Sequence, residues 1–374
     1  MIIGVPRETH RHEHRVGLTP LAARRFANQG HQVVVERSAG LAARFSDREY
    51  EEAGAQIVYS SEEAYRRADL VCKVGVISPE ELDLLKPGLV IGAFHHLAVA
   101  AKSTVERLRA LEVTAVGYEL IQDRSGRRSI LVPFSEMAGQ MAVYLASHYL
   151  QNEMGGRGIL LGSVPGIAPP TVLILGAGTV GRTAARRALA IGAHVIVLDE
   201  RLEKLRAVSQ ELSGQVVTQV VSQGRLAQYT RIADVVIGAV LIPGARAPFL
   251  VTEEMVKAMR PGSVIIDLSI DQGGCVETSR PRTLDNPTYV VHDVVHYCVP
   301  NMTANVARTA SRALSDAAQE FLDEIVANGA GAALRDNPGL AAGTYLYRGQ
   351  VVQEQLAALH GLPVPPLGDL LATD

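Results

Sequence analysis

Short β-branched runs alternate with amphipathic segments along two stretches of this chain, a pattern typical of successive βα units. In the first stretch the predicted strands are MIIGVP, HQVVVE, AQIVYS, DLVCKVG, LVIGAF and VTAVGYE. In the second they are TVLILGAG, HVIVLDE, QVVTQVV, DVVIGAV, SVIIDLS and YVVHDVV. Sheets of this kind bind ligands at the carboxyl ends of their strands. We therefore predict an α/β fold with two doubly wound, Rossmann-like domains, parallel sheets and an interdomain cleft.

The length of 374 residues also favours two domains, because it exceeds what one hydrophobic core usually organises. Between the two stretches lies a helical pattern, SEMAGQMAVYLASHYLQ, followed by the Gly- and Pro-rich loop sequence GGRGILLGSVPGIAPP. After Asn301 the chain is expected to return to helix and to remain helical up to a Pro-rich tail.

The charge and cysteine content exclude several classes of protein. A net charge of −3 and scattered arginines give no basic field for nucleic acid. The first residues become charged too soon for a signal peptide, and no apolar run reaches membrane-spanning length, so we expect a cytoplasmic protein with no membrane partner. Cys72, Cys275 and Cys298 are far apart, which favours buried thiols over disulfides or a metal site.

A glycine-rich loop is the strongest local signal. Gly176, Gly178 and Gly181 form a GxGxxG pattern between a predicted strand and a predicted helix, where the glycines permit a tight turn, approach of a pyrophosphate and close helix packing. Asp199 ends the next strand, where a carboxylate accepts hydrogen bonds from ribose hydroxyls and repels a 2′-phosphate. NAD is favoured, although Arg201 offers a charge for NADP; the alternative is a plain turn and a helix cap.

Several blocks together resemble the alanine dehydrogenase family, which is related to the nucleotide-binding subunit of proton-pumping transhydrogenase. They are GVPRETHRHEHRVGLTP, HLA, SEMAGQMA, LILGAGTVG, AVLIPGARAPFLVTEEMVKAMRPGSVIIDLSIDQGG and VVHYCVPNM. The resemblance implies a substrate domain formed by residues 1–130 and 306–374, with an NAD-binding domain, 131–305, inserted between them. It also implies a homo-oligomer, commonly a hexamer. The implied reaction is reversible oxidative deamination of L-alanine, or a similar small L-amino acid, to pyruvate or another 2-oxo acid and ammonia.

Such a reaction needs a cationic clamp for the substrate carboxylate and an acid/base group for water. By the resemblance, Arg15 and Lys73 hold the carboxylate and oxygen of the substrate, and Glu119 matches an acid near the substrate pocket. An arginine can bind a carboxylate through two parallel hydrogen bonds, whereas a lysine acts as a point charge. From the pattern alone, Arg15 and Lys73 read as a surface cation and a lysine at a strand end.

The doublet His95-His96 closes an apolar, strand-like run. Adjacent residues of an extended segment point to opposite faces, so only one of the two can readily face a cleft. His96 matches the catalytic position of the family, and imidazole titrates near neutrality, as an acid/base group for water should. We expect His95 to pack on the other side with a hydrogen bond to the backbone.

Asp271 follows the predicted strand SVIIDL at its carboxyl end and resembles the second catalytic residue of the family, which orients water and the histidine. Its plainer interpretation is a turn aspartate before two glycines. By the same resemblance, Ser135, Asn301 and Met302 flank the cofactor. The histidines of THRHEHR are interpreted as part of a solvated loop that presents Arg15, so no metal site is predicted.

The chain departs from the family pattern near the substrate residues. The family usually continues after the substrate lysine with another lysine, a glutamate and a proline, whereas this chain reads KVGVISPEE, with Gly75 at the place of that second lysine. Phe94, His95 and Phe134 replace a tyrosine, a leucine and a methionine. The side-chain preference is therefore open. An opine-type dehydrogenase that reduces an imine of a larger amine, and a noncatalytic transhydrogenase-like subunit, remain as alternatives.

Overall fold

The computed structural model describes residues 1–240 and 247–372, and it divides the chain into two compact units. Unit 1 comprises residues 1–134 together with the segment from residue 304 to the end of the described chain, and unit 2 comprises Ser135–Thr303. The family resemblance had placed these boundaries at 130/131 and 305/306. Residues 241–246, which carry most of the sequence block LIPGARAP, lie outside the described residues.

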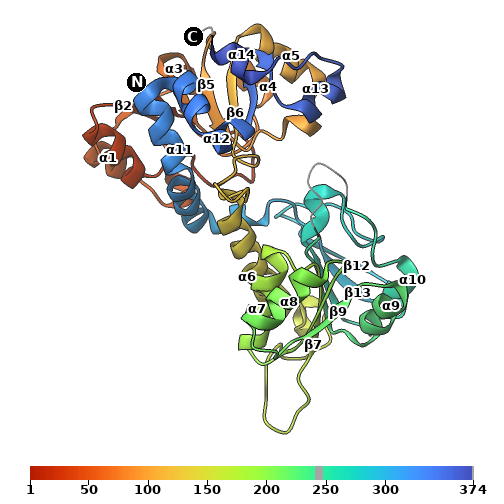
Figure 1. Cartoon of the computed structure of the whole chain (residues 1–374). Coiled ribbons are helices and arrows are strands. Elements are labelled where there is room, and N and C mark those ends of the chain that lie inside the picture. Colours follow the sequence, from red (N-terminus) through yellow and green to blue (C-terminus); the bar gives the residue numbers. More distant parts are fainter. Residues whose placement is uncertain (241–246, 373–374) are drawn as a thin grey trace. The chain divides into compact units, whose positions relative to one another are not determined.

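The sheet of unit 1 has eight strands in the order β15-β14-β6-β5-β4-β1-β2-β3 (Figure 1). Its parallel strands are β1 Ile2–Val5, β2 Gln32–Glu36, β3 Gln56–Val58, β4 Leu70–Cys72, β5 Val90–Ala93 and β6 Thr114–Gly117. Two antiparallel strands complete one edge, β14 Thr344–Tyr347 and β15 Gln350–Val351. The helices of unit 1 are α1 Pro20–Asn28, α2 Asp47–Glu52, α3 Ser61–Arg67, α4 Pro79–Leu82, α5 Lys102–Ala110, α11 Ala307–Asp336, α12 Pro338–Ala342, α13 Glu354–His360 and α14 Leu367–Leu371.

Several helices of unit 1 begin where the sequence provides caps. The Thr19 hydroxyl accepts a hydrogen bond from the backbone at the start of α1, and Pro20 follows at the first helical position. Ser46 and Ser78 form capping boxes with glutamates at the starts of α2 and α4. These caps satisfy backbone donors that have no partner within the helices.

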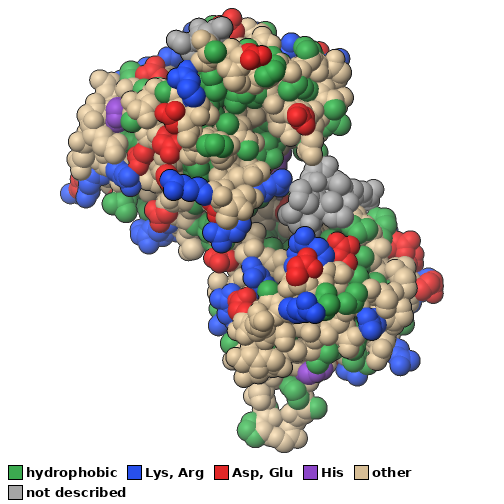
Figure 2. Space-filling model, viewed as in Figure 1, with side chains coloured by type: hydrophobic (Ala, Val, Ile, Leu, Met, Phe, Trp, Pro, Cys, Tyr) green, Lys and Arg blue, Asp and Glu red, His purple; other side chains and the backbone are tan. Residues whose placement is uncertain are grey.

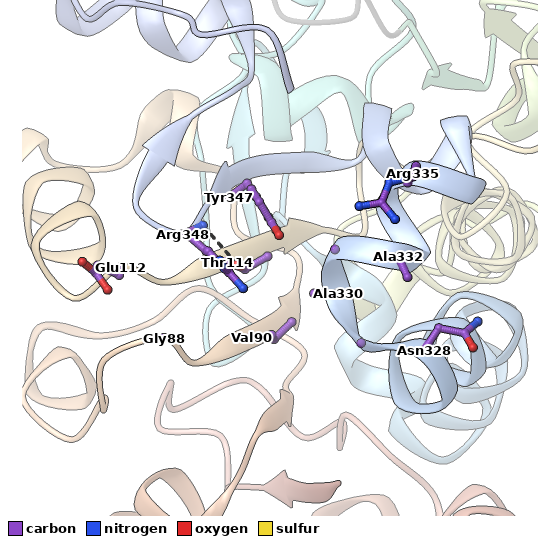
Figure 3. A pocket seen from close by; sticks show the side chains of 12 residues that line it. Gly88, Val90, Glu112, Thr114, Asn328, Ala330, Ala332, Arg335, Tyr347 and Arg348 are labelled. Atoms are coloured by element: carbon purple, nitrogen blue, oxygen red, sulfur yellow. Dashed lines mark hydrogen bonds between the residues drawn. The ribbon is translucent and has the colours of Figure 1, made fainter. Parts of the chain in front are cut away.

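Helix α11 is kinked at Gly329, where φ is 80° and ψ is 159°. A pocket of about 600 Å³ opens at this kink. Figure 3 shows the side chains of Tyr347 and Arg348 opposite the kinked segment, with Arg335 on the helix beyond it. The pocket contains none of the residues that the sequence nominates for chemistry.

The sheet of unit 2 has seven strands in the order β12-β13-β11-β10-β7-β8-β9. The strands are β7 Thr171–Leu175, β8 His194–Asp199, β9 Val217–Val220, β10 Val235–Gly238, β11 Val264–Asp267, β12 Thr288–Val291 and β13 Val294–Tyr297. The helices are α6 Leu131–Tyr149, α7 Thr179–Ala190, α8 Leu202–Glu211, α9 Gln223–Ile232 and α10 Glu253–Lys257. Alternate residues of β7 enter two separate cores, with Ile174 in one and Leu173 in the other, so the strand is covered on both faces.

The structure confirms the α/β class and the predicted strands β1 to β11, but both sheets are mixed rather than parallel. The sequence YVVHDVV forms a hairpin of β12 and β13, and the C-terminal region contributes β14 and β15 where only helix was expected. His292 and Asp293 turn the first hairpin, and Arg348 and Gly349 turn the second, all with positive φ. Such two-residue turns match the twist of antiparallel strands. Neither turn has the Asn-Gly or Asp-Gly sequence typical of such hairpins, so the sequence did not predict the hairpins.

The surface and the cysteines agree with the composition. Figure 2 shows basic and acidic side chains interspersed over the visible face of each unit, without a basic field. All three cysteines are buried and free, as expected. Among the helices formed by residues 1–240 and 247–372, none combines the length and the apolar character that a membrane span requires.

Candidate active site

The two sheets share one strand order around a central switch point. In unit 1 the order β3-β2-β1-β4-β5-β6 reverses between β1 and β4, and in unit 2 the order β9-β8-β7-β10-β11-β13 reverses between β7 and β10. Ligands of doubly wound sheets bind outside the carboxyl ends of the strands at this point. Most of the nominated side chains follow those ends, after β4, β5 and β6 in unit 1 and after β7, β8, β11 and β13 in unit 2.

Arg15 of unit 1 is buried and held by a carboxylate two residues before it. Its Nε donates to Glu13 Oε1 at 2.7 Å and its Nη2 donates to Glu13 Oε2 at 2.5 Å. The guanidinium carbon also lies 5.5 Å from the centre of the Phe134 ring. Two parallel hydrogen bonds are the geometry in which an arginine binds a carboxylate. Glu13 therefore occupies the Nε–Nη2 edge of Arg15, which is one of the edges through which a guanidinium binds a carboxylate.

Lys73 follows β4 and is 1% exposed. Its Nζ lies 2.8 Å from Glu8 Oε2 and 2.9 Å from Glu81 Oε1, and the Tyr65 hydroxyl donates to the same Glu81 oxygen at 2.9 Å. Glu8 also accepts hydrogen bonds from the backbone N–H groups of Val74 and Gly75. The ammonium of Lys73 thus links two buried carboxylates, and its assignment to the substrate remains a prediction.

The protonation of this cluster follows from its charges. Burial alone would lower the pKa of Lys73, but Glu8 and Glu81 outweigh it and raise the pKa above its ordinary value. Burial raises the pKa of the Glu8 carboxyl, and the Lys73 ammonium opposes that rise. We infer that Lys73 stays charged at neutral pH, because removing its proton would leave the carboxylates without a counter-ion.

Gly17 and Gly75 lie in the segments that carry Arg15 and Lys73. A Cβ on Gly17 would lie 2.3 Å from the Cys72 carbonyl oxygen, so the segment after Arg15 packs directly on the backbone before Lys73. A Cβ on Gly75 would lie 3.4 Å from Glu8 Oε2, which is an ordinary contact. A longer side chain at position 75 would therefore start beside the buried carboxylate.

The two neighbouring histidines have opposite environments. His95 is 1% exposed and its Nε2 donates to the Ile91 carbonyl at 3.1 Å, which confirms the expected packing and backbone hydrogen bond. Burial lowers the pKa of His95. The side chain of His96 is 55% exposed. The expected cause was wrong, because β5 ends at Ala93 and His96 has left-handed backbone angles, φ 47° and ψ 38°. A backbone turn, not strand alternation, separates the two rings.

The Glu119 carboxylate contacts both the backbone and the ring of His96. Its Oε1 accepts a hydrogen bond from the His96 backbone N–H at 2.6 Å and lies 3.8 Å from His96 Nδ1. The Phe94 ring lies nearly parallel to the His96 ring, with 6.3 Å between the ring centroids. Phe94 and Phe134 meet edge to face, with 5.2 Å between their centroids. The His96 ring is thus flanked by the carboxylate of Glu119 and by Phe94, which in turn packs against Phe134.

In unit 2 the glycine loop has the geometry expected of a nucleotide site. A Cβ on Gly176 would lie 2.4 Å from the Ala239 carbonyl oxygen, and one on Gly181 would lie 1.8 Å from the Gly176 carbonyl oxygen. A Cβ on Gly178 would meet nothing within 4 Å, so open space lies in front of the loop. Gly178 also begins α7 without a side-chain cap. This space and the uncapped N–H groups fit the pyrophosphate of a dinucleotide.

Asp199 connects the strand end to that loop. Its Oδ2 accepts a hydrogen bond from the Ala177 backbone N–H at 2.7 Å, and its Oδ1 accepts one from the Arg201 backbone N–H at 2.9 Å. Asp199 is not the cap of α8, whose N-cap is Arg201. The Arg201 side chain lies 3.4 Å from Glu203. The aspartate therefore positions the glycine loop in addition to any contact with ribose.

The remaining nominated residues of unit 2 fall into two groups. Asp271 lies in the short helix Leu268–Gln272, and its Oδ1 accepts a hydrogen bond from the Asn301 backbone N–H at 3.0 Å. The structure thus brings Asp271 and Asn301 together. Met302 is 4% exposed and its side chain packs into a core of unit 2, while Ser135 is half-buried on α6.

Sequence reasoning missed the carboxylates that organise the site. Glu8, Glu13 and Glu81 pair with the nominated cations. In unit 2, Asp267 is 1% exposed and accepts hydrogen bonds from the Ser269, Cys275 and Val276 backbone and from the Ser279 hydroxyl. Glu13 was detectable as the acid beside Arg15, whereas Glu8 is far from Lys73 in sequence, and Glu81 lies on the helix α4 that follows Lys73. Within the described ranges, no group of three or more His, Cys, Asp or Glu side chains could hold a metal ion.

The strand order and the glycine loop of unit 2 define a dinucleotide-binding α/β protein. Sequence models described as "Alanine dehydrogenase/PNT, N-terminal domain" and "Alanine dehydrogenase/PNT, C-terminal domain" match residues 4–139 and 142–354. The chain belongs to the alanine dehydrogenase/PNT family, whose members use NAD(H).

Individual relatives match over the full length. The chain is 40% identical over 372 residues to an alanine dehydrogenase from Mycobacterium tuberculosis, with 100% of both chains covered. It is 43% identical to an alanine dehydrogenase from Bacillus subtilis, covering 96% of this chain and 94% of that one. A solved L-alanine dehydrogenase structure superimposes with a TM-score of 0.93 at 38% identity, covering 96% of this chain and 99% of that one.

Proposed function

We propose that this chain is an oxidoreductase that catalyses the reversible, NAD-dependent oxidative deamination of L-alanine, or a similar small L-amino acid, to pyruvate or another 2-oxo acid and ammonia. The full-length similarity to alanine dehydrogenases supports it. The observation that carries it is the placement of His96, a half-exposed imidazole after β5 whose backbone is held by the buried Glu119. An acid/base group must be open to substrate and yet fixed in position.

In the proposed reaction, His96 moves protons at its imidazole. It accepts a proton from the water that attacks the iminium carbon of the substrate, and it returns a proton to the departing amine. Asp271, which is joined to the Asn301 backbone, is assigned by the family resemblance to orient that water. Both roles are proposals that the variants described below test.

The substrate carboxylate is assigned to Arg15. The guanidinium binds Glu13 through Nε and Nη2, and its remaining N–H donors are assigned to the substrate carboxylate. Lys73 is assigned to the substrate by the family resemblance, and its ammonium lies between Glu8 and Glu81. Glu119 contributes through the His96 backbone.

The cofactor is assigned to the glycine loop of unit 2. The loop shaped by Gly176, Gly178 and Gly181 would hold the pyrophosphate at the open space in front of Gly178, and Asp199 would select the unphosphorylated ribose of NAD. NAD supplies the hydride acceptor for the α-hydrogen when it is bound. Ser135, Asn301 and Met302 are assigned to its surroundings by resemblance alone, and the buried side chain of Met302 leaves its backbone for that contact.

A second candidate is favoured by the departures near the substrate residues. Gly75 leaves room and removes charge beside Glu8, and Phe134 places a ring against Arg15. These changes suit an opine-type dehydrogenase that condenses a larger amine with a 2-oxo acid and reduces the imine. NADH oxidation that requires such an amine, in the absence of ammonium, would identify it. A noncatalytic transhydrogenase-like subunit would bind NADH and reduce no 2-oxo acid.

We also propose a cytoplasmic homo-oligomer, a hexamer by resemblance. Leu160, Val164 and Ile167 are exposed on the loop before β7, and they offer an apolar surface for a second copy of the chain. Sedimentation analysis of the wild-type chain and of the Leu160→Ser/Ile167→Ser variant tests this. An unchanged oligomer in the variant would remove the loop from the interface.

A substrate panel tests the reaction itself. Each 2-oxo acid is mixed with ammonium, NADH and the purified chain, and NADH consumption is followed by absorbance. Pyruvate as the best substrate is the expected result. NADH binding without reduction of any 2-oxo acid would contradict the proposed reaction.

A further inference from the structure

The hydroxyl of Tyr345, on the C-terminal strand β14, reaches the acid beside His96. It donates to Glu119 Oε1 at 2.9 Å across 226 residues of sequence. Tyr345 is 4% exposed and Glu119 is 6% exposed, so water competes little for this hydrogen bond. None of the nominated site residues comes from this part of the chain.

The local backbone is built to deliver this hydroxyl. The pairing of β14 with β6 shifts register between Thr344 and Leu346, directly at Tyr345. Irregularities of this kind re-aim a side chain out of the regular ladder. A Cβ on Gly117 of β6 would lie 2.5 Å from the Tyr345 ring, so only glycine leaves the ring its place. The Tyr345 ring also lies edge to face with the ring of the buried His95, with 6.4 Å between the ring centroids.

Glu119 depends on Tyr345 for its orientation. Its Oε1 accepts from the Tyr345 hydroxyl and from the His96 backbone N–H, which stands at a left-handed residue. Its Oε2 is buried and has no hydrogen-bond partner among the described residues. The donors on one oxygen therefore set the direction of the whole carboxylate.

We propose that Tyr345 is a positioning residue that holds Glu119, and through it the backbone turn and imidazole of His96, in the geometry needed for proton transfer. Burial and the neighbouring Glu119 raise the pKa of Tyr345, so the phenol remains a neutral donor at working pH. The inference rests on the proposed function for its kinetic consequence, but not for its structural one.

The kinetic test is Tyr345→Phe, which removes the hydroxyl and keeps the ring against Gly117. We expect kcat for 2-oxo acid reduction to fall about tenfold, the effect of one lost buried hydrogen bond on a transition state, while KM values stay within about twofold. The matched control is Tyr347→Phe on the same strand, which should leave kcat near the wild-type value. An unchanged kcat in Tyr345→Phe, or a raised KM alone, would overturn the inference.

A coupling experiment separates positioning from general damage to the fold. If Tyr345 acts through Glu119, adding Tyr345→Phe to Glu119→Ala should cause little further loss of kcat. Full additivity of the two losses would show that Tyr345 acts by another route and would overturn the inference.

A measurement that needs no turnover keeps the two proposals apart. Diethyl pyrocarbonate modifies exposed imidazoles, and mass spectrometry gives the rate at each histidine. We expect Tyr345→Phe to change the rate at His96 by about threefold or more, because the ring and its pairing with Glu119 move, while the exposed His194 of unit 2 keeps its rate. An unchanged rate at His96 would overturn the positioning role. An inactive wild-type chain whose His96 labelling responds would contradict the proposed function and support the positioning role.

Discussion

Units 1 and 2 arrange their strands in the same order but build the carboxyl edges of their sheets from different chemistry. In unit 1, Arg15 and Lys73 are buried and paired with carboxylates from their own chain. In unit 2, the loop at Gly178 offers backbone N–H groups and open space, and Asp199 holds its neighbour Ala177. A site made of backbone is complete when its local segment folds, whereas a site made of charged side chains needs counter-ions from elsewhere.

His96 is the exception in unit 1, and replacing it should cause the largest effect. His96→Ala is expected to lower kcat about a thousandfold, because it removes the imidazole that exchanges protons with water in the proposed reaction. NADH binding, measured by nucleotide fluorescence, should survive because unit 2 is unchanged. His95→Ala is the control and should retain substantial activity. Near-normal turnover in His96→Ala would remove the acid/base role from that residue.

Lys73→Met tests whether the charge pairs of unit 1 are structural. Removing the ammonium leaves Glu8 and Glu81 buried without a counter-ion, so the free energy of unfolding should fall by about 3 to 5 kcal/mol. Urea unfolding measures this. The control is Lys86→Met, which breaks an exposed pair with Asp69 and should cost under about 1 kcal/mol. Normal stability with a raised KM for 2-oxo acid would instead assign Lys73 to the substrate.

The ion pairs of Lys73 with Glu8 and Glu81 predict that the protein loses stability at alkaline pH. The folded-state pKa of Lys73 lies above its ordinary value of 10.5. Its contribution is therefore fully present below the unfolded-state pKa and is lost as pH rises through the folded-state pKa. Unfolding measured from about pH 9 to about pH 12 should show a steeper loss in the wild type than in Lys73→Met. Parallel pH profiles would contradict this linkage.

Asp199→Ala tests the other unit. It removes the acceptor for the Ala177 N–H and the proposed ribose contact, so the Kd for NADH should rise about tenfold. The control is Asp234→Ala. Asp234 accepts a hydrogen bond from Thr171 at the opposite end of β7, so its loss should affect stability and not NADH affinity. Equal loss of NADH affinity in both variants would show that the effect is a general weakening of the sheet.

Gly75→Lys should have the smallest effect and sharpens the contrast in charge. The new ammonium would start beside Glu8 and add positive charge near Lys73, which is proposed to bind the substrate, so KM for pyruvate should fall about threefold. Gly75→Ala, which adds a methyl group without charge, is the control. An equal change in both variants would mean that packing, and not charge, determines substrate affinity at this position.

Much of the fold could be predicted because its signals are local. The strands β1 to β11 and the loop at Gly176 are written in short segments whose hydrophobic period and glycine spacing are sufficient. The hairpins β12-β13 and β14-β15 were missed, because His292-Asp293 and Arg348-Gly349 are unusual turn sequences. The difference between His95 and His96 was predicted in outcome but not in cause.

By itself, the sequence determined the α/β class and the glycine loop with Asp199, since each depends on residues close together along the chain. The nomination of His96 came from the resemblance of a short motif to the alanine dehydrogenase family. Only the tertiary structure decided that Lys73 joins Glu8 to Glu81 and that Tyr345 reaches Glu119 across 226 residues. Ion pairs and hydrogen bonds depend on distances of a few ångströms in space, and separation along the sequence does not indicate these distances. Such partners can therefore be identified only in the folded structure.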